Sequence, residues 1–137
     1  MRILIALGGN ALLRRGEPMT MAHQIANIRR AATQIAKLAD HNQLVVAHGN
    51  GPQVGDSLVR IELARRIVEP LPLGMLVAET AGWIGYMLQQ SLENALRKAG
   101  NARDVVTVLT QVEVAHDDPA LKDPKKFIGH GLSAARA

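Results

Sequence analysis

The sequence predicts an α/β protein with three layers, in which helices cover both faces of a mainly parallel sheet. Two short runs, residues 3–7 and 44–47, are apolar at every position, which is typical of strands buried on both faces. Each run ends at glycines, and a segment with helical periodicity separates the two. This order of strand, helix and strand favours parallel pairing through a right-handed crossover.

The first two predicted helices are amphipathic. One follows Thr20, a residue type that caps helices, and its apolar residues recur at alternating steps of three and four. They are Ile25, Ile28, Ala32, Ile35 and Ala39. The other extends over residues 53–68 and ends before Pro70.

A third, longer helix is predicted over residues 76–96, where apolar residues recur at steps of four, and Gly100 marks its end. Gly82 and Gly85 inside this helix suggest close packing against a neighbour. Residues 105–114 are rich in β-branched side chains and begin to alternate near their end, which predicts a third strand that is half exposed in its last part.

Composition excludes several classes of protein. With 137 residues the chain can hold one domain and a core without staples. The net charge of +4 would suit a nucleic-acid binder, but aromatic residues make up 2% of the chain and offer no stacking platform, so no nucleic-acid partner is expected. The chain has no cysteine, and its five histidines lack the spacing of metal ligands, so we expect neither disulfides nor a dedicated metal site.

The sequence also argues against a membrane location. Its apolar runs are interrupted by polar residues well before the roughly 20 residues that a membrane helix needs. The apolar opening, residues 3–7, is short and lacks the small residues of a signal-peptide cleavage site. We therefore expect a cytoplasmic protein.

Two glycine clusters follow the first two predicted strands, and this is where open α/β sheets bind anions. They are Gly8, Gly9 and Asn10, and Gly49, Asn50 and Gly51. Adjacent parallel strands place such loops on one rim, where backbone amides can approach an anion closely. Two alternatives stay open: the glycines could serve tight turns that need a positive φ angle, and the asparagines could merely cap turns.

Familiar nucleotide and nucleophile motifs are absent from the sequence. Neither glycine cluster continues into Gly-Lys-Ser or Gly-Lys-Thr, and no three glycines have the dinucleotide-binding spacing. The chain also lacks a Gly-x-Ser-x-Gly motif and any cysteine, which gives covalent nucleophilic catalysis little support.

Four segments carry a family resemblance. They are Ala-Leu-Gly-Gly-Asn-Ala-Leu at 6–12, His-Gly-Asn-Gly-Pro-Gln-Val-Gly at 48–55, Ile-Gly-Tyr-Met-Leu-Gln-Gln at 84–90, and Thr-Gln-Val at 110–112 with Asp-Pro-Ala at 118–120 and Lys-Phe-Ile-Gly at 126–129. In this order they resemble carbamate kinases of the amino-acid kinase fold. Related acetylglutamate, aspartate and uridylate kinases usually have a lysine just ahead of the first glycine pair, where this sequence has Ala6 and Leu7.

The resemblance implies the amino-terminal half of an amino-acid kinase fold. Residues 1–115 would form the carbamate- and phosphoryl-binding domain, and residues 116–137 would begin a lid subdomain with a divergent, truncated tail. The implied reaction is reversible phosphoryl transfer between ATP and carbamate, giving carbamoyl phosphate and ADP, with Mg²⁺ on the nucleotide phosphates. The nucleotide pocket would lie largely outside this chain, and a homodimer is expected.

The resemblance also assigns roles to residues. Gly8, Gly9 and Asn10 would surround the transferring phosphoryl group, and Lys126 would offer a cation from the lid. Gly49, Asn50 and Gly51 would hold carbamate. Such a site suits phosphoryl transfer, which depends on alignment and charge stabilisation. The alternative function is a catalytically inactive, truncated fragment that acts only as an anion-binding or dimerisation module.

Overall fold

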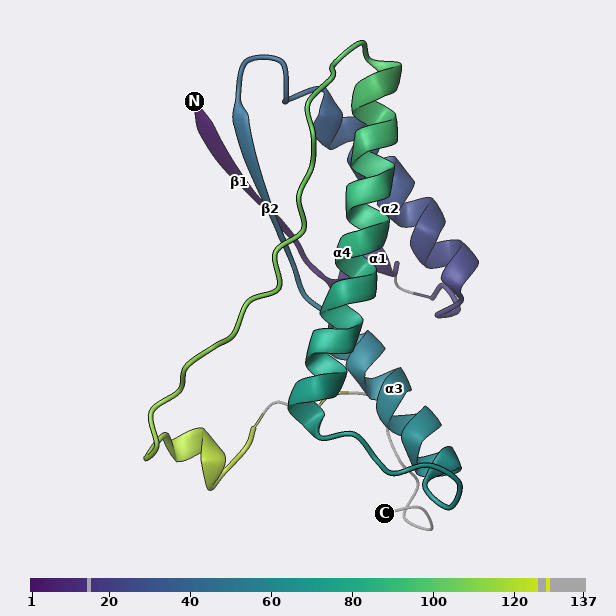
Figure 1. The fold of residues 1–137 in the computed structure, drawn as a ribbon, viewed down its shortest axis with the longest axis vertical. Coiled ribbons are helices and arrows are strands. Elements are labelled where there is room, and N and C mark those ends of the chain that lie inside the picture. Colours follow the sequence, from purple (N-terminus) through teal and green to yellow (C-terminus); the bar gives the residue numbers. More distant parts are fainter. Residues whose placement is uncertain (15, 126–127, 129–137) are drawn as a thin grey trace. The chain divides into compact units, whose positions relative to one another are not determined.

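The computed structural model describes residues 1–14, 16–125 and 128. The described chain forms two compact units. The first unit contains Met1–Asn50 and Ala81–Val108, and the second contains Gly51–Thr80 and the described residues after Val108. Figure 1 shows the order of the elements along the chain.

The first unit contains the predicted strand, helix and strand. Strand β1 (Arg2–Leu7) pairs in parallel with β2 (Gln43–His48), and helix α2 (Met21–Ala36) lies between them in sequence. The register places Ile3 beside Leu44 and Leu7 beside His48. Thr20 caps α2 as predicted, because its side-chain oxygen accepts a hydrogen bond from the backbone N–H of His23.

One face of the β1–β2 sheet forms the core of this unit. Ile5, Leu7, Leu44 and Val46 pack against apolar residues of α2 and of helix α4 (Leu73–Lys98), which lie on the same side of the strands (Figure 1). The opposite face is open, with Leu4 69% and Val45 58% exposed. The α/β class with a parallel sheet is confirmed. The structure differs from the expectation in that the strands of this unit are covered on one face.

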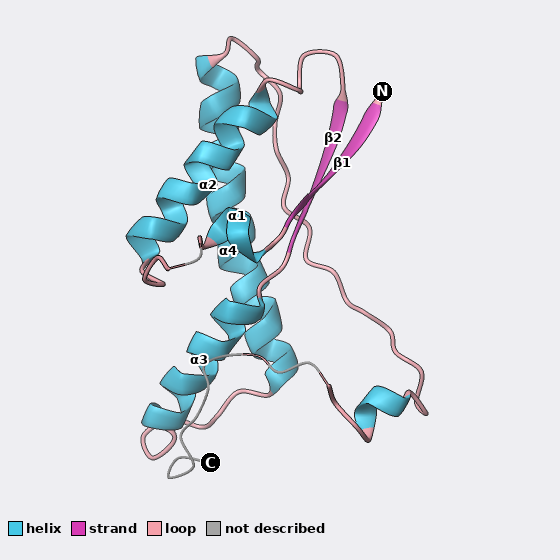
Figure 2. Ribbon diagram, turned by 180° about the vertical axis from the view of Figure 1, so that it is seen from behind, coloured by secondary structure: helices cyan, strands magenta, loops and turns pink. Residues whose placement is uncertain are grey.

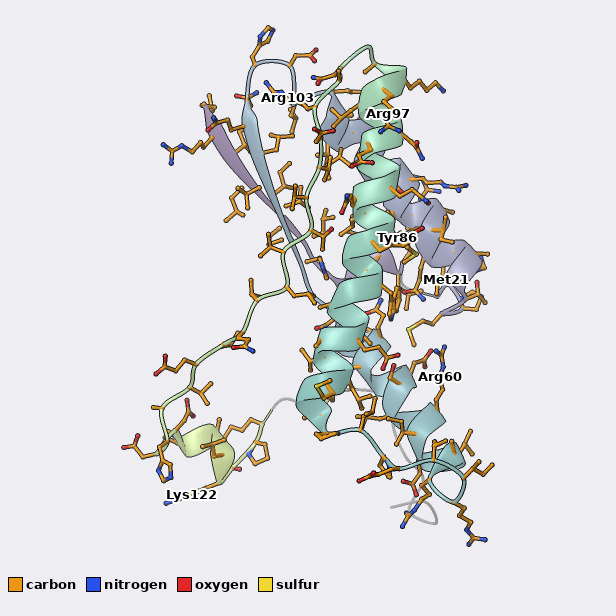
Figure 3. All side chains as sticks on the ribbon, viewed as in Figure 1. Met21, Arg60, Tyr86, Arg97, Arg103 and Lys122 are labelled. Carbon is orange, nitrogen blue, oxygen red and sulfur yellow. The ribbon has the colours of Figure 1, made fainter. Side chains whose placement is uncertain are left out.

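A second cluster joins α2, α4 and the short helix α1 (Gly9–Leu12). Leu12, Ile28, Ile84 and Met87 form it, and Trp83 packs against it. Leu12 is 1% exposed, so this cluster buries the end of α1 almost completely. Tyr86, on the same helix, is exposed (Figure 3).

The predicted close packing is found at Gly85 and not at Gly82. A Cβ atom at Gly85 would clash with the methyl group of Thr107, whereas a Cβ at Gly82 would meet open space. The Thr107 hydroxyl also donates a hydrogen bond to the carbonyl of Gly85 at 3.1 Å. Glycine at position 85 therefore lets the chain around Thr107 lie directly against α4.

The prediction of a third strand at residues 105–114 is wrong, because this segment pairs with neither β1 nor β2 and forms a loop (Figure 2). In the first unit, Val105 packs on the core while Val106 is exposed, so the strand-like alternation is present there. Among the described residues the sheet has two strands, and an extended segment without a hydrogen-bonded neighbour is not a strand. Arg103 instead ties the start of this segment to the carbonyl of Asn42 (Figure 3).

The second unit contains helix α3 (Gly51–Ala64) and the 3₁₀ turn η1 (Pro119–Leu121). Helix α3 ends at Ala64, four residues earlier than predicted, and the amide of Ile67 bonds the Ala64 carbonyl three residues back, which is the tighter turn common at helix ends. In the described part of the chain no helix combines the length and apolar character needed to cross a bilayer.

Candidate anion-binding site

The two predicted glycine loops leave the sheet at the same edge. Leu7 and His48 are partners in the parallel register, and each is the last residue of its strand. Gly8 and Gly49 therefore start their loops side by side, as the lower ends of the two strands in Figure 1 illustrate. The backbone N–H of Gly49 donates to the carbonyl of Leu7 at 3.3 Å, which ties the start of the second loop to the first strand.

The first loop turns at once into helix α1. Gly8 is the N-cap residue of α1, with φ −71° and ψ 175°. The amide of Ala11 donates to the Gly8 carbonyl at 2.9 Å and that of Leu13 to the Gly9 carbonyl at 2.7 Å, which closes a single helical turn. The first amides of any helix have no partner within it, so they are available to an anion. Asn10 is the second residue of this turn, and its side chain lies outside what the structure describes.

The fold does not require glycine at three of these positions. In the described chain the glycines with positive φ are Gly16 and Gly100, so neither loop depends on a left-handed conformation. A Cβ atom added at Gly8, Gly9 or Gly49 would meet no atom within 4 Å. The positive-φ explanation left open by the sequence is therefore wrong for Gly8, Gly9 and Gly49.

The second loop is a short connection from β2 to α3. Gly49 and Asn50 belong to the first unit, and the Nδ1 atom of His48 lies 3.2 Å from the Gly49 carbonyl oxygen. Gly51 is the first residue of α3 and belongs to the second unit, where a Cβ would make an ordinary 3.9 Å contact with Ile128. Lys126 lies outside the described residues.

A buried polar residue next to the first loop was missed by the sequence analysis. Asn27 of α2 is 4% exposed, and its amide group contacts the loop that follows α1. Its hydrogen bond lowers the pKa of Glu17, with a smaller contribution from the backbone N–H of Arg14, and desolvation opposes the shift. A single asparagine on an otherwise amphipathic helix gives little signal in a sequence, because most are solvated.

Neither a cluster of metal ligands nor a cavity accompanies the glycine loops in the described residues. Within the part of the chain that the structure describes, no three His, Cys, Asp or Glu side chains come together as metal ligands would. A shallow surface depression is lined by Glu62, Leu63, Arg65 and Arg66, none of which was predicted as a site residue.

A parallel sheet with glycine loops after its strands is an arrangement in which α/β folds bind anions, and the family comparison identifies which fold it is. The sequence model of the amino acid kinase family matches residues 1–125, and the chain belongs to this family. Within the family its similarity is to carbamate kinases. It is 55% identical to the carbamate kinase of Haemophilus influenzae over 130 residues, which are 94% of this chain and 40% of that protein.

Other relatives give the same result. The chain is 51% identical to the carbamate kinase of Escherichia coli K12 over 127 residues, covering 93% of this chain and 41% of the relative. Among solved structures, the carbamate kinase of Giardia lamblia bound to AMP-PNP superposes with a TM-score of 0.90 at 32% identity, covering 98% of this chain and 43% of that one. The resemblance seen in the motifs is confirmed, and the chain spans about two fifths of the length of these relatives.

Proposed function

We propose that this chain supplies the phosphoryl- and carbamate-binding side of a carbamate kinase site. The observation that carries the proposal is the set of three glycines, Gly8, Gly9 and Gly49, on one edge of the sheet, where the fold itself has no need of glycine. The similarity to carbamate kinases supplies the chemistry, which is phosphoryl transfer between ATP and carbamate.

In this proposal, backbone amides make most of the contacts with the substrates. The amides of Gly9 and Asn10 at the start of α1 would hold the transferring phosphoryl oxygens, since Gly8 leaves the approach to them open. Gly49, Asn50 and Gly51 would hold carbamate. Lys126 would neutralise charge from the lid that begins at residue 116. Alignment and charge stabilisation of this kind need no covalent enzyme intermediate.

ATP and ADP are the expected nucleotides, and the pocket for them would lie largely outside this chain. The described residues offer no ligand cluster that could hold Mg²⁺ by itself, so the ion would arrive on the nucleotide phosphates. A homodimer in the cytoplasm, with residues 1–115 as the binding domain, completes the proposal.

The second candidate is an inactive module that binds small anions or dimerises. The open space around Gly8, Gly9 and Gly49 would suit anion binding without turnover equally well. The two candidates differ in turnover. Formation of ATP from ADP and carbamoyl phosphate by the purified chain would establish the enzyme, whereas anion binding without turnover would establish the module.

Thermal unfolding tests the site itself. We expect phosphate or carbamoyl phosphate to raise the midpoint of unfolding and ATP to have little effect. Gly51→Val should abolish the anion effect while the protein still folds, because a side chain there would block the amides of the loop. Gly74→Val is the matched control, since Gly74 also lies in the first turn of a helix and has open space around it. An anion effect that survives in Gly51→Val would contradict the placement of the second loop.

A further inference from the structure

We propose that Asn27 is a positioning residue that holds the first glycine loop in the shape that binds phosphoryl oxygens. The inference rests on the proposed function. It concerns a side chain of α2 that touches neither glycine, so its effect would pass through helix α1.

The Asn27 amide makes three hydrogen bonds, two as a donor and one as an acceptor. Its Nδ2 atom donates to a carboxylate oxygen of Glu17 at 2.7 Å and to the carbonyl oxygen of Leu12 at 3.4 Å. Its Oδ1 atom accepts from the guanidinium group of Arg30 at 3.0 Å. Exchanging the two amide atoms would set oxygen against oxygen and nitrogen against nitrogen, so the network fixes this orientation.

These contacts hold the C-terminal end of α1, the helix that follows the first loop. Leu12 is the last residue of α1, and Gly9 is the first, so the whole helix is one turn. The Leu12 side chain is buried against α2 and α4, and its carbonyl faces Asn27. Because an isolated turn this short has no stability of its own, the direction of its first amides depends on such contacts.

Glu17 extends the same network to the loop between α1 and α2. Its Oε2 atom accepts from Asn27 and also from the backbone N–H of Arg14 at 3.3 Å. The chain on both sides of this irregular loop is thereby fastened to one buried amide. A leucine at position 27 would suit the neighbouring apolar cluster, whereas a buried amide is costly unless its partners are all present. The polar residue is therefore explained by the loop that it holds.

Hydrogen exchange tests the positioning without any ligand. Asn27→Leu should speed exchange of the Ala11 and Leu13 amides, which close the α1 turn, by at least roughly tenfold. The Gly49 amide, bonded to Leu7 in the sheet, should keep its rate. Unchanged rates at Ala11 and Leu13, or an equal rise at all three amides, would overturn the proposal.

A second pair of variants keeps the test valid if Asn27→Leu does not fold. Glu17→Ala removes one partner at a half-buried position, and we expect a rise of roughly two- to tenfold at the same two amides. Glu17→Gln keeps an oxygen acceptor and should restore the rates. Failure of Glu17→Gln to differ from Glu17→Ala would contradict the role of the Asn27 contact. The matched control is Asn101→Ala, which removes an asparagine–carboxylate bond to Asp40 elsewhere in the first unit.

Titration with inorganic phosphate, followed by the amide signals of the same variants, links the positioning to binding. Affinity should fall in Asn27→Leu and Glu17→Ala and not in Asn101→Ala. If the unmodified chain does not bind phosphate, the proposed function fails, while the exchange experiment still decides whether Asn27 positions α1. If the unmodified chain binds and Asn27→Leu binds equally well, the proposed function stands and the positioning role is refuted.

Discussion

The two glycine loops start side by side on the sheet but are stabilised in different ways. The second loop runs directly from β2 into α3, a helix of 14 residues. The first loop runs into α1, a helix of four residues, followed by an irregular connection to α2. A long helix fixes the direction of its own first turn, because each further residue adds a backbone hydrogen bond. A single turn cannot, so the first loop depends on side chains from α2 and α4.

Similar sequence motifs can therefore depend on different structural elements for their stability. Gly-Gly-Asn and Gly-Asn-Gly both follow strands. The second loop is supported by the helix that follows it directly, whereas the first loop is supported by residues further along the chain. For the first loop they are the buried side chain of Leu12 and the amide of Asn27. Four experiments separate the two loops further.

The largest effect is expected from Leu12→Ala. Leu12 is 1% exposed in the cluster that holds α1, so we expect a loss of about 2–5 kcal/mol in the free energy of unfolding. Val54→Ala in α3 removes fewer atoms and should cost less. Urea unfolding measures both, with circular dichroism for each and the fluorescence of Trp83 for the Leu12 cluster. Equal losses would show that the first loop has no special dependence on its anchor.

Gly9→Ala and Gly49→Ala come next. Both positions have open space and ordinary φ angles, so we expect changes in stability below about 1 kcal/mol. Phosphate affinity should fall about tenfold or more in each variant, a cost of about 1.4 kcal/mol. Isothermal titration calorimetry measures the affinity. If one variant binds as tightly as the unmodified chain, its loop does not touch the anion.

A smaller effect is expected from acid. The pKa of Glu17 is lowered in the folded chain, so its carboxylate stabilises the fold at neutral pH, and this contribution is lost as the pH falls below about 4.5 and through the lowered pKa. The difference in unfolding free energy between the unmodified chain and Glu17→Gln should therefore shrink on acidification. Chemical unfolding at pH 7 and pH 3 measures it. A difference that stays constant would exclude Glu17 as the titrating support of the first loop.

The smallest effect is expected on the open face of the sheet. Val45→Thr keeps the β-branched shape at a position that is more than half exposed, and surface changes of this kind stay within about 0.5 kcal/mol. Phosphate affinity should be unchanged, because Val45 lies within β2 and in neither loop. A weaker anion response in the variant would connect the open face to the site and weaken the contrast between the loops.

The sequence predicted features that depend on local patterns and on parallel topology. The apolar runs and the glycines after them identified both strands, and parallel pairing then put Gly8 and Gly49 on one edge. It could not predict which strand faces are covered, because Leu4 and Val45 are apolar whether or not a layer packs on them. It also could not tell an extended segment from a strand at residues 105–114, since a strand exists only with a hydrogen-bonded partner.

The site was predicted less completely than the fold. Glycines have a distinctive pattern, so their positions were found, and the structure adds that Gly8, Gly9 and Gly49 are surrounded by open space. Asn27 was missed because its partners, Leu12 and Glu17, are 15 and 10 residues away and no local spacing joins them. The role of Lys126 stays a prediction, as it lies outside the described residues.

The register of β1 and β2 sets a rule for how this chain can change in length. Since both loops start directly after the paired residues Leu7 and His48, a deletion of one residue within either strand would turn its core side chains to the open face. A deletion of two would keep the faces but draw the loops apart by about 7 Å along the sheet. Insertions in the irregular connections on either side of α2 would leave the loops aligned. Length variation among natural or engineered forms is therefore expected in those connections and not in the strands.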